Sequence, residues 1–230
     1  MKFGVVIFPG SNCDQDLIYV LRDILKQEVV CLWHKEGQLQ DVDFVLLPGG
    51  FSFGDYLRSG AIARFSPLMK EIIAFAGRGG YVMGICNGFQ ILTEAGLLPG
   101  ALLHNVSCQF ICRNSYLRLG TTRSLITANL NVQEVLKIPI AHGEGNYFIN
   151  TDGLKQLQDQ DQILFRYCDE LGYLTPISNP NGSIDHIAGI CNATRNVFGM
   201  MPHPERAADS IVGNQDGLAI FESILNRVNA

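Results

Sequence analysis

The sequence has few charged residues and no cluster of positive ones. Asp, Glu, Lys and Arg make up 17% of its 230 residues, below the roughly one quarter usual in globular proteins. The formal net charge is -5, and no basic run offers the positive stripe that nucleic-acid backbones require. We therefore expect no nucleic-acid partner. The low charge agrees equally well with a surface that docks a partner protein and with a large apolar core.

Long apolar segments are also missing. No hydrophobic stretch reaches the roughly 20 residues that cross a membrane as a helix. Residues 1–17 are apolar only briefly and contain no small-residue cleavage pattern, so they do not resemble a signal peptide. No internal repeat, low-complexity tract or linker interrupts the chain. We expect one domain over residues 1–230, in the cytoplasm and without membrane contact.

The seven cysteines have neither the spacing of a metal site nor that of a disulfide framework. Their number is odd, no C-x-x-C pair occurs, and a chain of this length needs no covalent cross-links. Cys108 and Cys112 form a close pair, but a zinc site would need two more ligands in register. We expect reduced thiols, no metal site, and ordinary packing roles for every cysteine except Cys86.

Hydrophobic periodicity predicts alternating strands and helices in the first half of the chain. Short apolar runs read as buried strands, and segments with apolar residues at helical spacing read as helices. Ser11 or Asn12 is placed to cap the first helix, and Pro67 to begin the second. The predicted strands are 3–8, 29–33, 43–50 and 81–86, and the predicted helices are 12–25, 67–80 and 87–96.

The second half has more strand-like runs and closes with an amphipathic helix over 216–228. Segments 110–127 and 137–149 read as an antiparallel addition, and later strands are expected near 162–167, 187–192 and 196–205. Strand and helix in alternation predict a parallel sheet covered on both faces. The predicted fold class is therefore α/β: a doubly wound, mostly parallel, three-layer (αβα) sheet with a small antiparallel β insertion.

Cys86 lies between two glycines, where a predicted strand meets a predicted helix. The order Gly84-Ile85-Cys86-Asn87-Gly88 is typical of a nucleophile elbow, a tight turn that exposes one reactive side chain. The helix amides and dipole favour a negative sulfur, by at most about 2 kcal/mol. Lowering the pKa of an ordinary thiol by two units takes roughly 2.7 kcal/mol. A histidine should therefore lie nearby.

His203 is the favoured base. It lies between Pro202 and Pro204, which stiffen the loop, and Glu205 follows two residues later. In an extended loop these two side chains project to the same side, so the carboxylate can orient the imidazole.

A rival pair, His142 and Glu144, has the same spacing in a looser, glycine-containing loop. On physical grounds His203 is preferred, and the rival stays open. His34, His104 and His186 have no such surroundings, and we expect structural or surface roles for them.

An oxyanion intermediate needs two backbone donors. The Asn87 amide supplies one at the elbow. Gly49 and Gly50 end the preceding strand and can bring bare backbone to the same sheet edge, although a plain Pro-Gly-Gly turn explains them as well.

Together these segments resemble the triad-type (class I) glutamine amidotransferases. The elbow GICNGFQ, the LPGG loop and MPHPE occur in the family's order. Further segments extend the resemblance from end to end, toward the branch that supplies ammonia for de novo purine synthesis: GGFSFGDYLRSGAIARFSP, LLPGALLHN, IPIAHGEGNY and NPNGS.

The resemblance implies a mechanism and its residues. Cys86 would attack the side-chain amide of glutamine, with His203 moving protons and Glu205 orienting it. Gly50 and Asn87 would stabilise the oxyanion, while Gln90 and Phe51 would hold the substrate. The AHGEG segment would lie near the site or on the partner surface.

The resemblance also implies partners. A synthetase subunit would use ATP and Mg²⁺ to convert formylglycinamide ribonucleotide to the amidine, and a small third subunit would join the complex. This chain has no phosphate-binding loop of the G-x-x-x-x-G-K-[ST] kind, so we expect no cofactor on it. Phe51, Phe53, Tyr56 and Arg58 are of types enriched at interfaces, although local packing explains them equally well.

Two other functions stay open. One is a partner-independent hydrolase or deglycase with an elbow cysteine. The other is a catalytically silent binding subunit that only activates its partner.

Overall fold

The computed structural model describes residues 1–228, which form two compact units. The first unit comprises Met1–Leu98 and Asn196–Gly199, and the second comprises Pro99–Arg195 and the described residues from Met200 onward. The single domain expected over residues 1–230 stays a prediction.

Parallel strands form the centre of the first unit. Strand β1 pairs in parallel with β2 and with β3, and β3 pairs in parallel with β4. Strands β1, β3 and β4 are rich in apolar residues and largely buried, as strands covered on both faces should be, whereas the edge strand β2 is mostly exposed or half-buried. The ring of Phe44 lies 5.7 Å from that of Phe3 and 6.3 Å from that of Phe198, so aromatic side chains line one face. In sheet order the strands are β2 (Glu28–Trp33), β1 (Lys2–Ile7), β3 (Phe44–Leu47), β4 (Tyr81–Ile85) and β11 (Val197–Met200).

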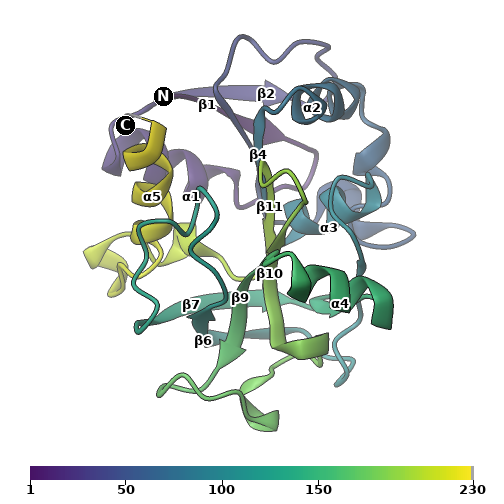
Figure 1. Cartoon of the computed structure of the whole chain (residues 1–230). Coiled ribbons are helices and arrows are strands. Elements are labelled where there is room, and N and C mark those ends of the chain that lie inside the picture. The colour runs from purple at the N-terminus through teal and green to yellow at the C-terminus, as the bar shows by residue number, and fades with distance from the viewer. Residues whose placement is uncertain (229–230) are drawn as a thin grey trace. The chain divides into compact units, whose positions relative to one another are not determined.

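Helices lie on both sides of these strands (Figure 1). Helix α1 packs against β1, while α3 packs against β3 and β4 on the other side. A cross-strand hydrogen bond from Val82 N to Asn196 O (2.8 Å) joins the last strand to this unit. The helices are α1 (Asp14–Tyr19), the π-helical segment η1 (Val20–Ile24), α2 (Pro67–Gly77) and α3 (Asn87–Glu94).

The start of the first helix differs from the sequence prediction. The N-cap is Cys13, whose side chain makes no capping hydrogen bond. Ser11 instead bonds back to Phe8, accepting from its N–H and donating to its carbonyl at 3.0 and 2.8 Å. The predicted helix over 12–25 also changes to π geometry at Val20. Leu25 N there donates to Val20 O, five residues earlier, which is the hydrogen bond of a π-helix.

Antiparallel strands dominate the second unit. Strand β9 pairs with both β10 and β6, and β6 pairs with β7 along eight residues of each. A separate two-stranded sheet joins β5 and β8. The strands are β5 (Ala101–Leu103), β6 (Ile111–Leu119), β7 (Val135–His142), β8 (Asn146–Phe148), β9 (Ile163–Cys168) and β10 (Ile187–Cys191).

The helices of the second unit are α4 (Thr151–Asp159) and α5 (Leu218–Val228). The side chain of Asn150 caps α4 by accepting a hydrogen bond from Gly153 N at 2.8 Å. Among the helices of residues 1–228, none has the length and apolar character needed to cross a bilayer. Short 3₁₀ turns complete the two units: η2 (Ser52–Asp55), η3 (Ala63–Phe65), η4 (Pro176–Ser178), η5 (Ile184–His186), η6 (Pro204–Arg206) and η7 (Ser210–Val212).

These elements confirm the predicted α/β class with parallel strands, flanking helices and antiparallel additions. Every strand and helix expected in the first unit is present, with shifts of a few residues at the ends. Helix α4 and strand β5 were not predicted from the sequence.

Candidate active site

Cys86 occupies a sharp turn between β4 and α3 in the first unit. Its backbone has φ 52° and ψ -108°, a combination that residues other than glycine rarely adopt. Such strain costs on the order of 1–3 kcal/mol and persists only where the surrounding structure enforces it. Helix α3 begins at the next residue, and Gln90 N donates the first helical bond to the Cys86 carbonyl at 3.1 Å. The strained turn therefore places this cysteine at the N-terminus of the helix, as the elbow motif predicts.

Gly84 and Gly88 are needed because strand and helix approach so closely. A Cβ on Gly84 would lie 2.4 Å from the backbone of Gly88, and a Cβ on Gly88 would lie 2.0 Å from the carbonyl oxygen of Leu47. Both obstacles are main-chain atoms, which cannot swing aside. These contacts confirm the close packing that the glycine spacing predicts.

The Asn87 side chain links the elbow to the loop after β3. Its Oδ1 accepts a hydrogen bond from Ser52 N at 3.1 Å, and its Nδ2 donates to Asp55 at 3.2 Å and to Gln90 at 2.8 Å. Because every contact matches the polarity of the amide, its orientation is fixed. Sequence reasoning named Asn87 and Gln90 but missed Ser52 and Asp55, which lie about 35 positions away in the chain.

Gly50 has a positive φ of 131° and lies directly against the loop after β1. A Cβ there would meet Asn12 N at 2.6 Å and Ser11 Cα at 2.7 Å. Contact with the loop after β1 therefore leaves no room for a side chain at Gly50. This requirement is compatible with a role for the Gly50 amide as an oxyanion donor. The Phe51 ring is about half exposed, at 47%, and its N–H is already bonded to Gly10 O at 2.8 Å.

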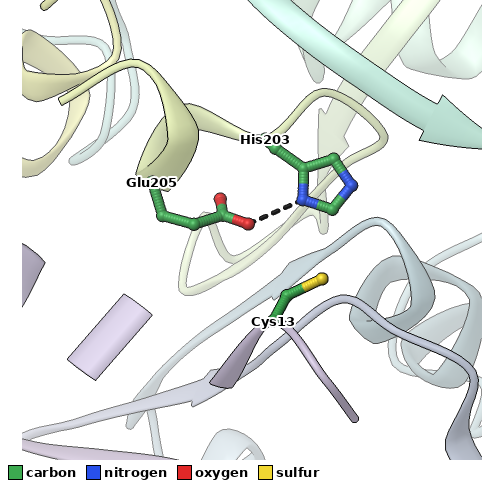
Figure 2. A group of neighbouring side chains, drawn as sticks. All are labelled: Cys13, His203 and Glu205. Atoms are coloured by element: carbon green, nitrogen blue, oxygen red, sulfur yellow. Dashed lines mark hydrogen bonds and ion pairs between the residues drawn. The ribbon is translucent and has the colours of Figure 1, made fainter. Parts of the chain in front are cut away.

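His203 and Glu205 lie together in the second unit. The His203 Nδ1 and a Glu205 carboxylate oxygen are 2.6 Å apart, and both side chains are buried (Figure 2). The hydrogen bond predicted from the Pro-His-Pro-Glu spacing is therefore present, although Glu205 belongs to a 3₁₀ turn rather than an extended loop. His203 N also donates to Pro139 O on β7 at 2.8 Å, which fixes the start of this loop.

The rival pair does not form. His142 Nδ1 is 3.1 Å from the side-chain oxygen of Asn105, while Glu144 faces His104 at 3.6 Å. Burial, reinforced by the positive charge of nearby His203, lowers the pKa of His142 to about 4. His142 is therefore uncharged at neutral pH and has no carboxylate to orient it.

A buried network holds the loop after His142. Gly145 N donates to Asn105 at 3.0 Å, and Gly145 O accepts from Asn181 at 2.8 Å and from Ser183 at 3.2 Å. A Cβ on Gly145 would lie 2.2 Å from the His142 ring, so only glycine fits there. Sequence reasoning named the segments containing these residues without predicting that they meet.

The structure thus describes two groups of candidate residues, each within its own unit. The first unit contains Cys86, Asn87, Gln90, Gly50 and Phe51. The second contains the His203–Glu205 pair, with His142 and Asn105 nearby.

Comparison with known proteins shows which family the chain belongs to. A family model described as a CobB/CobQ-like glutamine amidotransferase domain matches residues 1–218. A protein of Acaryochloris marina named phosphoribosylformylglycinamidine synthase subunit PurQ is 55% identical over 230 residues, covering 100% of this chain and 98% of its own length. A protein of the same name from Koribacter versatilis is 55% identical over 225 residues, covering 98% and 97%.

Solved structures give the same result at the level of the fold. A chain in the structure of PurLQS from Thermotoga maritima is 42% identical and superimposes with a TM-score of 0.86. The match covers 99% of this chain and 98% of that one.

Proposed function

Because the chain belongs to the CobB/CobQ-like glutamine amidotransferase family, as one of its PurQ subunits of phosphoribosylformylglycinamidine synthase, we propose that Cys86 releases ammonia from glutamine. The observation that carries the proposal is the strained Cys86 turn at the start of α3. Cys86 is itself buried, at 5% exposure, but a cysteine with a packing role alone would not need this conformation, whereas a nucleophile at an elbow does.

The reaction begins with attack by the Cys86 sulfur on the side-chain amide carbon of glutamine. As the carbon–sulfur bond forms, the carbonyl π pair moves to oxygen and gives a tetrahedral oxyanion. This intermediate collapses when the amide nitrogen takes a proton and leaves as ammonia, so that a thioester remains. Water then attacks the thioester, the carbon–sulfur bond breaks, and glutamate departs.

His203 moves the protons in both halves. It accepts the thiol proton, delivers it to the leaving nitrogen, and then removes a proton from the attacking water. Glu205 accepts the Nδ1–H of His203 at 2.6 Å. That bond leaves Nε2 for proton transfer and stabilises the imidazolium that forms.

Backbone amides of Gly50 and Asn87 serve as the oxyanion donors in this proposal. The fixed side chain of Asn87 supports this role, because its bonds to Ser52, Asp55 and Gln90 hold the residue whose amide would act. Gln90 and Phe51 are assigned to the glutamine pocket.

We further propose that the ammonia passes to a synthetase subunit, with a small third subunit completing the assembly. The relatives' name describes a subunit of a synthase, and the solved relative is titled PurLQS. The synthetase would bind ATP and Mg²⁺ and convert formylglycinamide ribonucleotide to its amidine, while this chain carries no cofactor. A cytoplasmic location is part of the proposal: Cys108 and Cys112 are exposed thiols, which suit a reducing compartment.

The test compares two nitrogen sources in the assembled synthase. Cys86→Ser should abolish glutamine-dependent synthesis and leave ammonia-dependent synthesis intact. Cys31→Ser, at an exposed thiol on β2, is the matched control and should change neither. Loss of both activities in Cys86→Ser would favour a silent structural subunit.

Two further assays address the remaining alternatives. Rapid hydrolysis of substrates other than glutamine, without the synthetase, would favour the partner-independent hydrolase. For the base, His203→Ala should block thioester formation. If His142→Ala blocks it and His203→Ala does not, the assignment of the base is wrong.

A further inference from the structure

A second imidazole lies near His203, and its proton position can be read from its partners. Asn105 Nδ2 donates to Gln109 O at 2.8 Å and to His142 O at 2.9 Å. The other end of this amide, Oδ1, accepts from Gly145 N at 3.0 Å and therefore must be the acceptor facing His142. The 3.1 Å contact to His142 Nδ1 is then an Nδ1–H···O bond. His142 is held as the Nδ1–H tautomer, with Nε2 unprotonated.

The two histidines differ in the charge of the group that holds them. Glu205 offers a carboxylate to His203, which favours the imidazolium form. Asn105 offers His142 a neutral amide of similar shape. An amide oxygen orients an imidazole as well as a carboxylate does but adds no negative charge to stabilise a proton.

We propose that Asn105 is a positioning residue that, through His142, reserves the proton of the reaction for His203. This inference rests on the proposed function, because His203 must become an imidazolium when it takes the Cys86 proton. A charged ring at His142 would repel that imidazolium, and a basic ring there would compete for the proton. An amide at position 105 prevents both effects while keeping the ring in place.

The surroundings of His142 leave little else that could stabilise a charge on it. His142 is 3% exposed, and its Nε2 has no hydrogen-bond partner among the residues that the structure describes. Gly145 lies directly against the ring, since a Cβ there would be 2.2 Å from it. The two carboxylates closest to it in the sequence motifs have other partners: Glu205 bonds to His203, and Glu144 faces His104. The pKa of His142, lowered to about 4 by burial and by His203, agrees with this arrangement.

The tautomer can be tested directly in the unmodified protein. In the full-length chain with ¹⁵N-labelled histidine, the His142 signals are identified by their loss in His142→Gln. We expect the neutral Nδ1–H pattern from pH 8 down to pH 5. An Nε2–H pattern, or titration of His142 with a pKa of 6 or above, would overturn the proposal.

The functional consequence is tested with Asn105→Asp, which keeps the acceptor oxygen toward His142 and adds one negative charge. Because aspartate also lacks the Nδ2 donor to Gln109 O and His142 O, the free energy of unfolding of this variant is measured alongside its activity. A neighbouring carboxylate raises a histidine pKa by about 1–3 units, so the pKa of His142 should rise from about 4 to between about 5 and 7. At the upper end of that range most of the ring is charged at pH 6. The matched control is Asn150→Asp, which adds the same charge at the exposed cap of α4 and keeps the acceptor for Gly153 N.

We expect glutamine hydrolysis by Asn105→Asp, measured with the synthetase present, to fall severalfold relative to wild type at pH 6, and by about tenfold if the pKa of His142 reaches about 7. The loss should shrink to within about threefold at pH 9, where His142 is neutral again; one unit of pKa shift corresponds to a factor of about ten. The control should follow wild type at both pH values. An equal loss at all pH values indicates a merely structural role for Asn105 and overturns the proposal, as does an altered pH profile in the control.

The result is separable from the proposed function. If Cys86 is not the nucleophile, the Nδ1–H tautomer of His142 is still observed but Cys86→Ser retains glutamine hydrolysis. If Asn105 has no positioning role, Cys86→Ser is inactive but the pH-dependent loss in Asn105→Asp is absent.

Discussion

Gly88→Ala is the substitution for which the structure predicts the largest effect from the smallest change. The added methyl group would lie 2.0 Å from Leu47 O, 2.7 Å from Leu47 C and 2.9 Å from Leu47 Cβ. Ordinary van der Waals contact begins at 3.4 Å, so the shortest contact is 3.4 - 2.0 = 1.4 Å too close. Because two of the three atoms are main chain, the start of α3 has to move away from β3.

The magnitude follows from that displacement. Overpacking a close-packed site costs about 1–3 kcal/mol and occasionally more; a contact with main-chain atoms belongs at the upper end, about 3 kcal/mol. A misplacement of about 1 Å in a catalytic group can reduce the rate about 10²-fold. We therefore expect Gly88→Ala to lose both stability and glutamine hydrolysis, the latter by about two orders of magnitude.

Urea unfolding measures the free energy of unfolding, and ammonia release from glutamine measures activity. Alkylation of Cys86, located by mass spectrometry, reports whether the elbow is still formed. The control is Gly77→Ala at the end of α2, where an added Cβ meets nothing within 4 Å. Alanine is favoured over glycine in helices by about 1 kcal/mol, so this variant should be as stable as wild type or more so.

The two glycine substitutions should thus have opposite effects on stability. If Gly88→Ala unfolds at the wild-type urea concentration and keeps its activity, helix and strand are not as close as described. The explanation of the glycine-flanked cysteine would then be wrong.

Three other predictions concern single side chains. Glu205→Gln keeps the shape but removes the charge that holds His203, and should lower the rate of thioester formation about 10²-fold without a comparable change in KM. Asn87→Ala leaves the buried N–H of Ser52 without its partner and should lower the free energy of unfolding by about 1–3 kcal/mol. His142 binds its proton with a pKa of about 4 when folded and about 6.5 when unfolded. Its contribution to stability is therefore present above pH 6.5 and lost as the pH falls toward 4, by up to roughly 3 kcal/mol, a loss that His142→Gln should remove.

Each of these predictions has a result that contradicts it. A rise in KM alone for Glu205→Gln would indicate a substrate contact instead of orientation of the base. Wild-type stability of Asn87→Ala would mean that another group replaces the amide. If the free energy of unfolding of His142→Gln falls between pH 6.5 and pH 4 as much as that of wild type, this imidazole is not buried as a neutral ring.

The elbow could be predicted from the sequence because its requirements are local. Gly84, Cys86 and Gly88 are fixed by the contact between one strand and the helix that follows it, so their spacing carries the information. The His203–Glu205 bond was predictable for the same reason, since two residues separate the partners and prolines stiffen the loop. The backbone between them adopts a different conformation from the one assumed, but the side chains still meet.

Contacts between distant segments could not be read from the chain. Asn105 and His142 are 37 positions apart, and nothing in either segment indicates that an amide rather than Glu144 meets the imidazole. The helix α4 was missed because Gly153 and several polar residues weaken its apolar pattern. The sequence feature that indicates this helix is Asn150, a residue type that often caps helices, which accepts a hydrogen bond from Gly153 N. The change to π geometry after Tyr19 has no sequence signal that we can identify.

The central claim is that one thiol, Cys86, attacks glutamine with help from His203. It is tested most directly by treating the chain with a glutamine-mimicking diazo ketone and locating the adduct by mass spectrometry. We predict one adduct per chain on Cys86, formed much more slowly in His203→Ala and prevented by glutamine. An adduct on another cysteine, or equally rapid labelling of Cys86 in His203→Ala, would contradict the account.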